Sequence, residues 1–155
     1  MITRRFNKSD AEETAQVIAT TLRKVNIADY SHEYIEETIR THSAEVLMQR
    51  SEYGHMYVVC DNEKIIGCGA IAGYWGSLTE SILLTIFVLP EYHKQGIGRK
   101  IIETLEKDEF FLRASRIEIP ASITACEFYK KMGYTYKNGI TMPDDEGLIR
   151  LEKRR

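Results

Sequence analysis

The stretch from Ser81 to Lys100 constrains the fold of this chain more than any other part of it. Residues Ser81 to Leu89 are almost all apolar or β-branched, and the run stops at Pro90. Such a run is typical of a central strand that is covered on both faces. A loop over Glu91 to Gln95 and the turn Gly96-Ile97-Gly98 then lead into apolar residues at helical spacing. The segment therefore predicts a buried strand, a glycine turn and an amphipathic helix, in that order.

Capping residues and alternating patterns divide the remainder of the chain. Ser9-Asp10-Ala11-Glu12 has the spacing of a capping box and predicts a helix from there to about Lys24. Ser31 predicts the start of a second helix, whose apolar positions continue to Leu47. The other elements are expected as a hairpin of strands over Met56–Cys60 and Ile65–Tyr74, a turn at Trp75–Ser77, a strand over Arg116–Pro120, a helix from Ser122 to about Met132, and strands at Tyr134–Tyr136 and Leu148–Glu152.

This order of elements, ααβββαβαββ, defines the expected fold class. Strands that begin as a hairpin and then alternate with helices predict an α/β fold of the mixed α+β kind. We expect a central, mixed but mostly antiparallel sheet flanked by helices. No repeat or linker divides the 155 residues, so we expect a single domain over residues 1–155.

Charge and cysteine content exclude several functional classes. The 21 Lys and Arg residues are balanced by 23 Asp and Glu residues, whereas binding to nucleic acid or a membrane surface needs a concentrated basic field. No apolar run approaches the ~20 residues that cross a bilayer. Cys60, Cys68 and Cys126 have neither CxxC nor zinc-ligand spacing. We therefore expect buried reduced thiols, no metal and a cytoplasmic location.

The glycine turn has the properties of a phosphate-binding site. Amides at the start of a helix lack partners, and the helix dipole favours an anion there. Glycine lets an anion approach the backbone closely, and Lys94, Arg99 and Lys100 add positive charge. The turn is neither a Walker A loop nor the dinucleotide fingerprint, because Ile101 stands at the third glycine position. On the turn alone, a phosphate site and a tight turn without a ligand are equally good interpretations.

Two motifs resemble those of the GCN5-related N-acetyltransferases, the GNAT family. The stretch Ile86–Lys100 is similar to the family's strand, loop and helix that bind the pyrophosphate of acetyl-CoA, usually written R/Q-x-x-G-x-G/A. The stretch Ser122–Tyr134 resembles the family's N-x-x-A-x-x-F-Y-x-x-x-G-F helix. The resemblance covers Val58 to Leu151. It implies a GNAT fold, acetyl-CoA as cofactor and transfer of an acetyl group to a primary amine.

The resemblance also implies which residues hold the cofactor. The backbone of Ile86 and Val88 is expected to pair with the pantetheine arm like an added strand. His93 replaces the motif's Arg or Gln, and Ser122 stands where Asn is common, so we expect weakened rather than abolished binding. The cofactor-binding residues that the resemblance implies are Ile86, Phe87, Val88, His93, Lys94, Gln95, Gly96, Ile97, Gly98, Arg99, Lys100, Ser122, Ala125 and Tyr129.

Acetyl transfer to an amine needs a proton donor for the leaving thiolate and a route for the amine proton. By resemblance Tyr129 is the general acid; on helical spacing alone it would be a core tyrosine. Many family members carry an acid in the middle of the strand, but Ile82 to Thr85 contains none. Glu80 is the nearest acid, and we expect a water chain to act as base in preference to it.

The acceptor is poorly specified. Residues 26–59 hold six acids and two bases, so either an acidic entrance for a cationic amine or a solvated helix face fits them. Tyr30, Tyr34, Tyr74 and Trp75 are candidate acceptor-pocket residues, with a core role as the alternative. His32 and His42 lie in the same region and have no role assigned.

Two functions therefore remain open. The leading one is a cytoplasmic, acetyl-CoA-dependent N-acetyltransferase that acts by direct transfer. The alternative is an acyl-CoA-binding sensor or interaction module without catalysis, which the missing strand carboxylate motivates. The expected partner is a small-molecule or peptide amine, with no nucleic acid and no membrane. A homodimer is left open.

Overall fold

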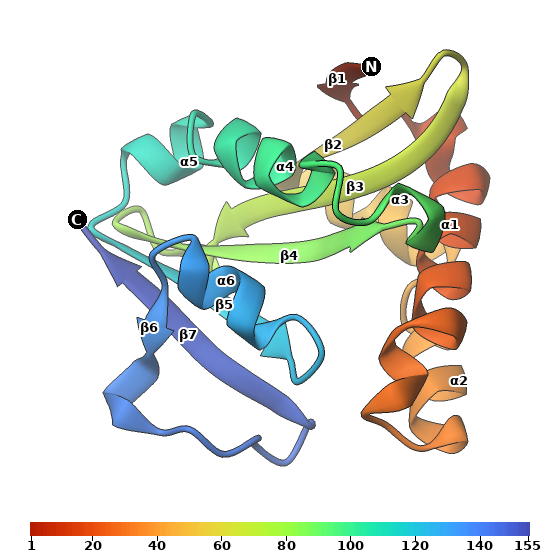
Figure 1. The fold of residues 1–155 in the computed structure, drawn as a ribbon. Coiled ribbons are helices and arrows are strands. Elements are labelled where there is room, and N and C mark those ends of the chain that lie inside the picture. Colours follow the sequence, from red (N-terminus) through yellow and green to blue (C-terminus); the bar gives the residue numbers. More distant parts are fainter.

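One seven-stranded sheet carries the fold, and the computed structural model describes all residues from 1 to 155 (Figure 1). The strands lie in the order β1-β2-β3-β4-β5-β7-β6, and every neighbouring pair is antiparallel except the parallel pair β4 and β5. The strands are β1 (Ile2–Arg5), β2 (Gly54–Asp61), β3 (Lys64–Gly73), β4 (Glu80–Val88), β5 (Arg116–Ser122), β6 (Thr135–Tyr136) and β7 (Leu148–Arg154). The mixed, mostly antiparallel sheet that the sequence predicts is thus confirmed.

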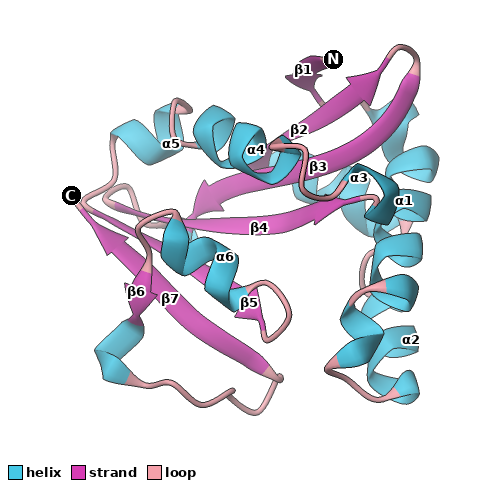
Figure 2. Cartoon of the chain, in the orientation of Figure 1, coloured by secondary structure: helices cyan, strands magenta, loops and turns pink.

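Helices cover both faces of the first half of the sheet (Figure 2). They are α1 (Ala11–Lys24), α2 (His32–Arg40), α3 (Ala44–Tyr53), α4 (Ile97–Leu105), α5 (Glu109–Leu112) and α6 (Cys126–Lys131). A Cβ at Gly67 or Gly69 of β3 would meet Ile101 of α4, so this face of the sheet carries α4. A Cβ at Gly54 would meet Ala72 and the Arg50 carbonyl, so the opposite face carries α3. None of the helices has the length and hydrophobicity needed to span a bilayer.

Several predicted elements form with their predicted caps. The Ser31 hydroxyl accepts the Tyr34 N–H at 3.0 Å and starts α2. The four apolar residues predicted for the helix after the glycine turn, Ile97, Ile101, Ile102 and Leu105, are all buried. Cys60, Cys68 and Cys126 are buried and unpaired, as expected.

Other boundaries differ from the prediction because competing caps are present. The chain makes a 3₁₀ turn over Lys8–Asp10 before α1, and the Asp10 carboxylate accepts the Asn7 N–H at 2.7 Å, so Ser9 is not the cap. Ser43 caps Val46 and thereby splits the second predicted helix into α2 and α3. Ser122 ends β5, and its hydroxyl accepts the Ala125 N–H at 3.1 Å in the turn before α6, which begins only at Cys126.

Two short elements, β1 and α5, are absent from the predicted order. Each has four residues, too few for a hydrophobic period to be visible in the sequence. Strand β1 adds an edge to the sheet by pairing Ile2 to Arg5 with β2. These additions leave the centre of the sheet unchanged.

Strands β4 and β5 separate after three paired positions, and this is the feature that positions the site. Glu80, Ser81 and Ile82 pair with β5, and beyond Ile82 the two strands diverge (Figure 1). The second half of β4 is therefore only half-buried from Ile86 to Val88, whereas the sequence predicts cover on both faces. Beyond Ile82 the backbones of β4 and β5 are no longer paired, and a space separates the two strands.

Charged side chains of β5 form a buried cluster of ion pairs with residues of the neighbouring segments of the chain. The side chain of Glu118 on β5 is 1% exposed and binds Arg116 and Lys137, each at 2.9 Å, and Arg150 at 3.3 Å. Arg116 also binds Glu80 of β4 at 2.8 Å. Burial alone would raise the pKa of Glu118, but its hydrogen bonds to Lys137 and Arg116 lower that pKa below the ordinary value. The carboxylate thus stays charged among three cations.

We predict that Glu118→Gln lowers the free energy of unfolding by about 3–5 kcal/mol, because it removes the charge of the buried carboxylate that Arg116, Lys137 and Arg150 share. Because the folded-state pKa of Glu118 is lowered, its contribution is complete above the ordinary carboxyl pKa and is lost as the pH falls through the folded value. Urea denaturation at neutral and acidic pH measures both effects. Glu127→Gln is the control, since the side chain of Glu127 is 75% exposed; equal losses in the two variants would contradict the prediction.

Candidate active site

The divergence of β4 from β5 creates a cleft of about 1020 Å³. Its walls come from β4, the α1–α2 segment, the start of α4, α6 and β7. The predicted site residues that line it are Tyr30, Tyr34, Trp75, Ile86, Phe87, Val88, His93, Lys94, Gly96, Ile97, Gly98, Arg99, Ser122, Ala125 and Tyr129. The predicted residues outside its lining are Tyr74, Glu80, Gln95 and Lys100.

The glycine turn presents unpaired amides to one end of the cleft. Gly96 adopts the left-handed conformation, with φ of 80°, and no side chain caps the helix that follows. The first intrahelical bond runs from the Lys100 N–H to the Gly96 carbonyl at 3.0 Å, so the three preceding amides have no partner in the helix. Lys94 and Arg99 lie beside them on the cleft. This geometry favours the anion site over a turn without a ligand.

Gly98 has a packing role that the sequence analysis missed. A Cβ at this position would lie 3.0 Å from Cζ of Phe128 on α6. The absence of a side chain therefore lets α6 approach the start of α4. Gly96 differs, because a Cβ there would meet nothing within 4 Å and only its backbone conformation requires glycine.

His93 stabilises the loop between β4 and α4 through a hydrogen bond to the backbone. Its Nε2 donates to the Val88 carbonyl at 2.8 Å, and the Thr21 hydroxyl approaches the same oxygen at 3.2 Å. The histidine that replaces the motif's Arg or Gln thus acts on the backbone of β4. The Val88 carbonyl thus accepts a hydrogen bond from His93, while the single proton of the Thr21 hydroxyl is directed to the closer Val17 carbonyl at 2.8 Å.

Tyr129 places a proton donor in the cleft from α6. It is 5% exposed, and its hydroxyl has no hydrogen-bond partner in the protein. Burial, with a smaller contribution from Cys68, raises the pKa of Tyr129 far above the ordinary tyrosine value. The phenol therefore remains protonated near neutral pH.

Tyr30 and Tyr34 form a clasp across the opposite end of the cleft. Their rings stack with centroids 4.3 Å apart. Their hydroxyls donate to the carbonyls of Gly147 and Glu146, each at 2.6 Å, and so join the α1–α2 segment to the loop before β7. Both residues line the cleft, but their hydroxyls already have protein partners.

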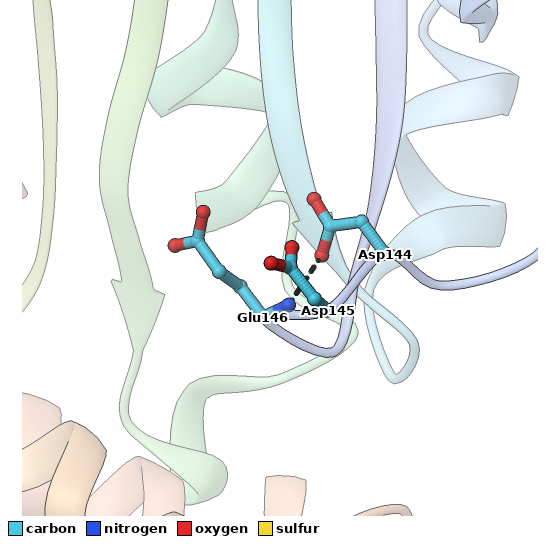
Figure 3. Close-up of side chains that lie close together, drawn as sticks. All are labelled: Asp144, Asp145 and Glu146. Carbon is cyan, nitrogen blue, oxygen red and sulfur yellow. Dashed lines mark hydrogen bonds between the residues drawn. The ribbon is translucent and has the colours of Figure 1, made fainter.

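An acidic loop precedes β7, and Figure 3 shows its three carboxylate side chains close together. Asp144, Asp145 and Glu146 each bring one oxygen within 4.8 Å of the others. The Asp144 carboxylate accepts the Glu146 and Leu148 N–H groups at 2.9 and 3.0 Å and binds Arg150 at 2.9 Å. Asp144 therefore holds the turn that presents the two carbonyls to the tyrosines.

The other predicted acceptor and base residues lie at or outside the rim. Trp75 lines the cleft edge but is 90% exposed, while Tyr74 stacks under Arg116, whose guanidinium lies 5.0 Å from its ring centre. Glu80 lies outside the cleft with its carboxylate bound to Arg116. Neither Tyr74 nor Glu80 is placed to contact a molecule in the cleft.

The acids counted in residues 26–59 do not form an acidic entrance. Glu36 pairs with Arg23, Glu52 with Lys8 and Glu37 with Arg40. Among those acids Glu37 alone lines the cleft. The structure thus favours the solvated helix face over a cation-attracting surface.

Thr85, Arg50 and His42 line the cleft, and the sequence assigns none of them a role. Two residues of β4, Thr85 and Ile86, bulge opposite Gly69, and Thr85 has φ of 59°, which is rare for a β-branched residue. Arg50 of α3 donates from Nη1 to the Thr85 hydroxyl at 2.8 Å. His42, at the end of α2, lines the cleft beside them. A bulge and its support depend on tertiary contacts that no local pattern encodes.

Solved structures with a similar fold include several acetyltransferases. The PaiA N-acetyltransferase of Thermoplasma acidophilum in complex with coenzyme A superposes with a TM-score of 0.84 at 21% identity, covering 99% of this chain and 98% of the other. A GCN5-related N-acetyltransferase of Rhodopseudomonas palustris gives 0.81 at 21% identity, covering 99% and 95%. An aminoglycoside 6'-N-acetyltransferase complexed with coenzyme A gives 0.70 at 18% identity, covering 99% and 97%.

Sequence comparison assigns the family directly. The acetyltransferase (GNAT) domain model matches residues 52–136, which is more than half of the chain. No curated protein matches the sequence. The mixed sheet with its split between β4 and β5 is the architecture of an acetyltransferase, and the chain belongs to the GNAT family.

We predict that Gly147→Ala destabilises the protein by opening the clasp. A Cβ at Gly147 would lie 3.1 Å from Cε2 of Tyr34 and 3.2 Å from Cε1 of Tyr30. Gly139→Ala is a matched control, because Gly139 has a similar positive φ but open space around it. Both variants strain the backbone by about 1–2 kcal/mol, and Gly147→Ala should cost at least about 1 kcal/mol more in denaturant unfolding. Equal losses would refute the packed clasp.

Proposed function

We propose that this GNAT protein is an acetyl-CoA-dependent N-acetyltransferase in which a primary amine attacks the thioester directly and Tyr129 serves as proton donor. The observation that carries the proposal is the cleft itself. One end has free amides and cations, and Tyr129 offers an unpartnered hydroxyl within the same space. Family membership supports acetyl transfer in general, and the amine acceptor and the role of Tyr129 are the parts proposed here.

The cleft residues fit acetyl-CoA by charge and shape. The amides of Ile97, Gly98 and Arg99, with the side chains of Lys94 and Arg99, suit a pyrophosphate. The diverging half of β4 offers a backbone edge to an extended, amide-bearing arm. When bound, acetyl-CoA supplies an acetyl group activated as a thioester.

Tyr129 acts at the sulfur in this proposal. A thiolate leaving group resembles ionised cysteine, which is a weaker base than an ionised tyrosine. The buried phenol therefore stabilises the departing sulfur chiefly as a hydrogen-bond donor, and its raised pKa keeps the donor proton in place before the reaction. Because the phenol is neutral, negative charge develops beside Tyr129 only when the carbon–sulfur bond breaks and the thiolate forms.

We predict that Gly98→Val weakens acetyl-CoA binding at least tenfold, which is about 1.4 kcal/mol. The branched side chain would displace Phe128 and crowd the amides at the start of α4. Titration calorimetry on the folded variant measures the loss.

The Phe128→Ala background separates the two causes of that loss. Removing the ring gives the valine room, so affinity that recovers in the double variant assigns the effect to packing. Affinity that stays low assigns it to crowding at the amides. Unchanged affinity in Gly98→Val itself would refute the anion-site assignment.

We predict that Tyr129→Phe lowers kcat and kcat/KM together by about 10²-fold while acetyl-CoA affinity changes little, because only the transition state uses the donor. Tyr134→Phe is the control from the same motif. Tyr134 is 1% exposed and donates to Glu106 at 2.9 Å, so its loss should reduce stability and spare turnover. Normal turnover in Tyr129→Phe would remove Tyr129 from the mechanism.

Free-thiol release from acetyl-CoA tests the function as a whole. The acceptor panel holds spermidine, kanamycin, L-lysine and a short peptide with a free N-terminus; kanamycin is included because a structural neighbour is an aminoglycoside acetyltransferase. Acceptor-dependent thiol release supports the proposal. Binding of coenzyme A without release for any acceptor would favour the alternative, an acyl-CoA-binding sensor or interaction module without catalysis.

A further inference from the structure

His42 lies over the floor of the cleft next to the bulge in β4. Its ring packs edge-on against Phe87, with the centroids 5.7 Å apart. Phe87 and Leu84 pair with Cys68 and Ala70, which are alternate residues of β3 and so point to one face of the sheet. His42 thus shares its side of the sheet with the residues on both sides of the bulge. No residue of β4 near the bulge has a carboxylate side chain.

The hydrogen bonds of His42 leave one nitrogen free. Nδ1 lies 2.8 Å from the Thr38 carbonyl, and because a carbonyl only accepts, Nδ1 carries the proton of the neutral ring. The Thr41 hydroxyl lies 3.2 Å from the same nitrogen, but it donates its own proton to the Thr38 carbonyl at 2.8 Å. Nε2 then holds the lone pair. It makes no hydrogen bond in the protein and is not among the fully buried unpartnered atoms, and the residue lines the cleft.

The charges around His42 favour its neutral form. Arg50 of α3 is the nearby cation, and burial together with Arg50 lowers the pKa of His42 below the ordinary histidine value. Glu37 of α2 also lines the cleft but is paired with Arg40. The neighbouring cleft residues of α1 and β4, such as Thr21, Thr85 and Phe87, have no charge.

We propose that Nε2 of His42 is the catalytic base that accepts the proton of the acceptor amine. This inference rests on the proposed function and extends it to a residue outside both sequence motifs. The supporting geometry is the fixed tautomer, the free nitrogen and the position of the ring beside the bulge.

The reaction balances with His42 and Tyr129 in these roles. The amine nitrogen forms a bond to the acetyl carbon, and the bond from that carbon to sulfur breaks. One amine proton passes to Nε2 of His42, and the sulfur leaves as a thiolate that accepts a hydrogen bond from the Tyr129 hydroxyl. His42 then holds one proton more and the thiolate one fewer than in free coenzyme A, and transfer through water carries that proton from His42 to the sulfur. The products are the amide and free coenzyme A.

The variant His42→Asn tests the role of the base. The asparagine side-chain amide can still donate to the Thr38 carbonyl, but it has no basic nitrogen. We expect kcat/KM for thiol release with the acceptor panel to fall about 10²–10⁴-fold near neutral pH. The acidic limb of the wild-type profile, which lies below the ordinary histidine pKa, should disappear. Added imidazole should restore part of the rate. His32→Asn is the control on the exposed first turn of α2 and should change the rate less than twofold.

Nitrogen-15 NMR of the histidine side chains provides a readout that needs no acceptor. We expect His42 to show the Nδ1–H tautomer and its pKa to lie below the ordinary histidine value. A proton on Nε2, or an unchanged rate and pH profile in His42→Asn, would overturn the assignment while the transferase function stands. If the wild-type protein releases no thiol with any acceptor, the proposed function fails and the assignment fails with it.

Discussion

The parting of β4 from β5 is the constraint on which the rest of the site depends. Two parallel strands would normally continue their ladder, yet here only three positions pair, from Glu80 to Ile82. The Glu118 cluster binds the strands where they still touch, and the tyrosine clasp joins the far walls where they have separated. The cleft lies between these two sets of interactions.

The bulge at Thr85 is strained, and the structure supports it from both sides. A β-branched residue with a positive φ persists only where its surroundings impose that conformation. Arg50 binds the Thr85 hydroxyl, and the Cys68 thiol donates to the Thr85 carbonyl at 3.2 Å. The buried Nε of Arg50 has no partner, so this guanidinium carries a desolvation cost that further supports a functional reason for its position.

Local sequence patterns were sufficient to predict the central strand β4 and the glycine turn at one end of the cleft. The apolar run of β4 and the glycine turn are dictated by neighbouring residues, so both were predictable, as was the capping hydroxyl of Ser31. Glu80 and Tyr74 were misplaced because the sequence does not reveal that Arg116 engages both of them. His42 was not predicted as a site residue because its position depends on the fold. Ser43 follows it directly and caps α3, so α2 has already ended and the chain turns at this point.

One physical cause, burial, prepares both proposed proton-transfer groups. Removal from water disfavours the charged form of any side chain, whatever its sign. For Tyr129 the charged form is the anion, so burial raises its pKa and preserves a donor. For His42 the charged form is the cation, so burial lowers its pKa and preserves an acceptor, and Arg50 acts in the same direction. A half-closed cleft between diverging strands thus separates an acid from a base without a carboxylate on the strand between them.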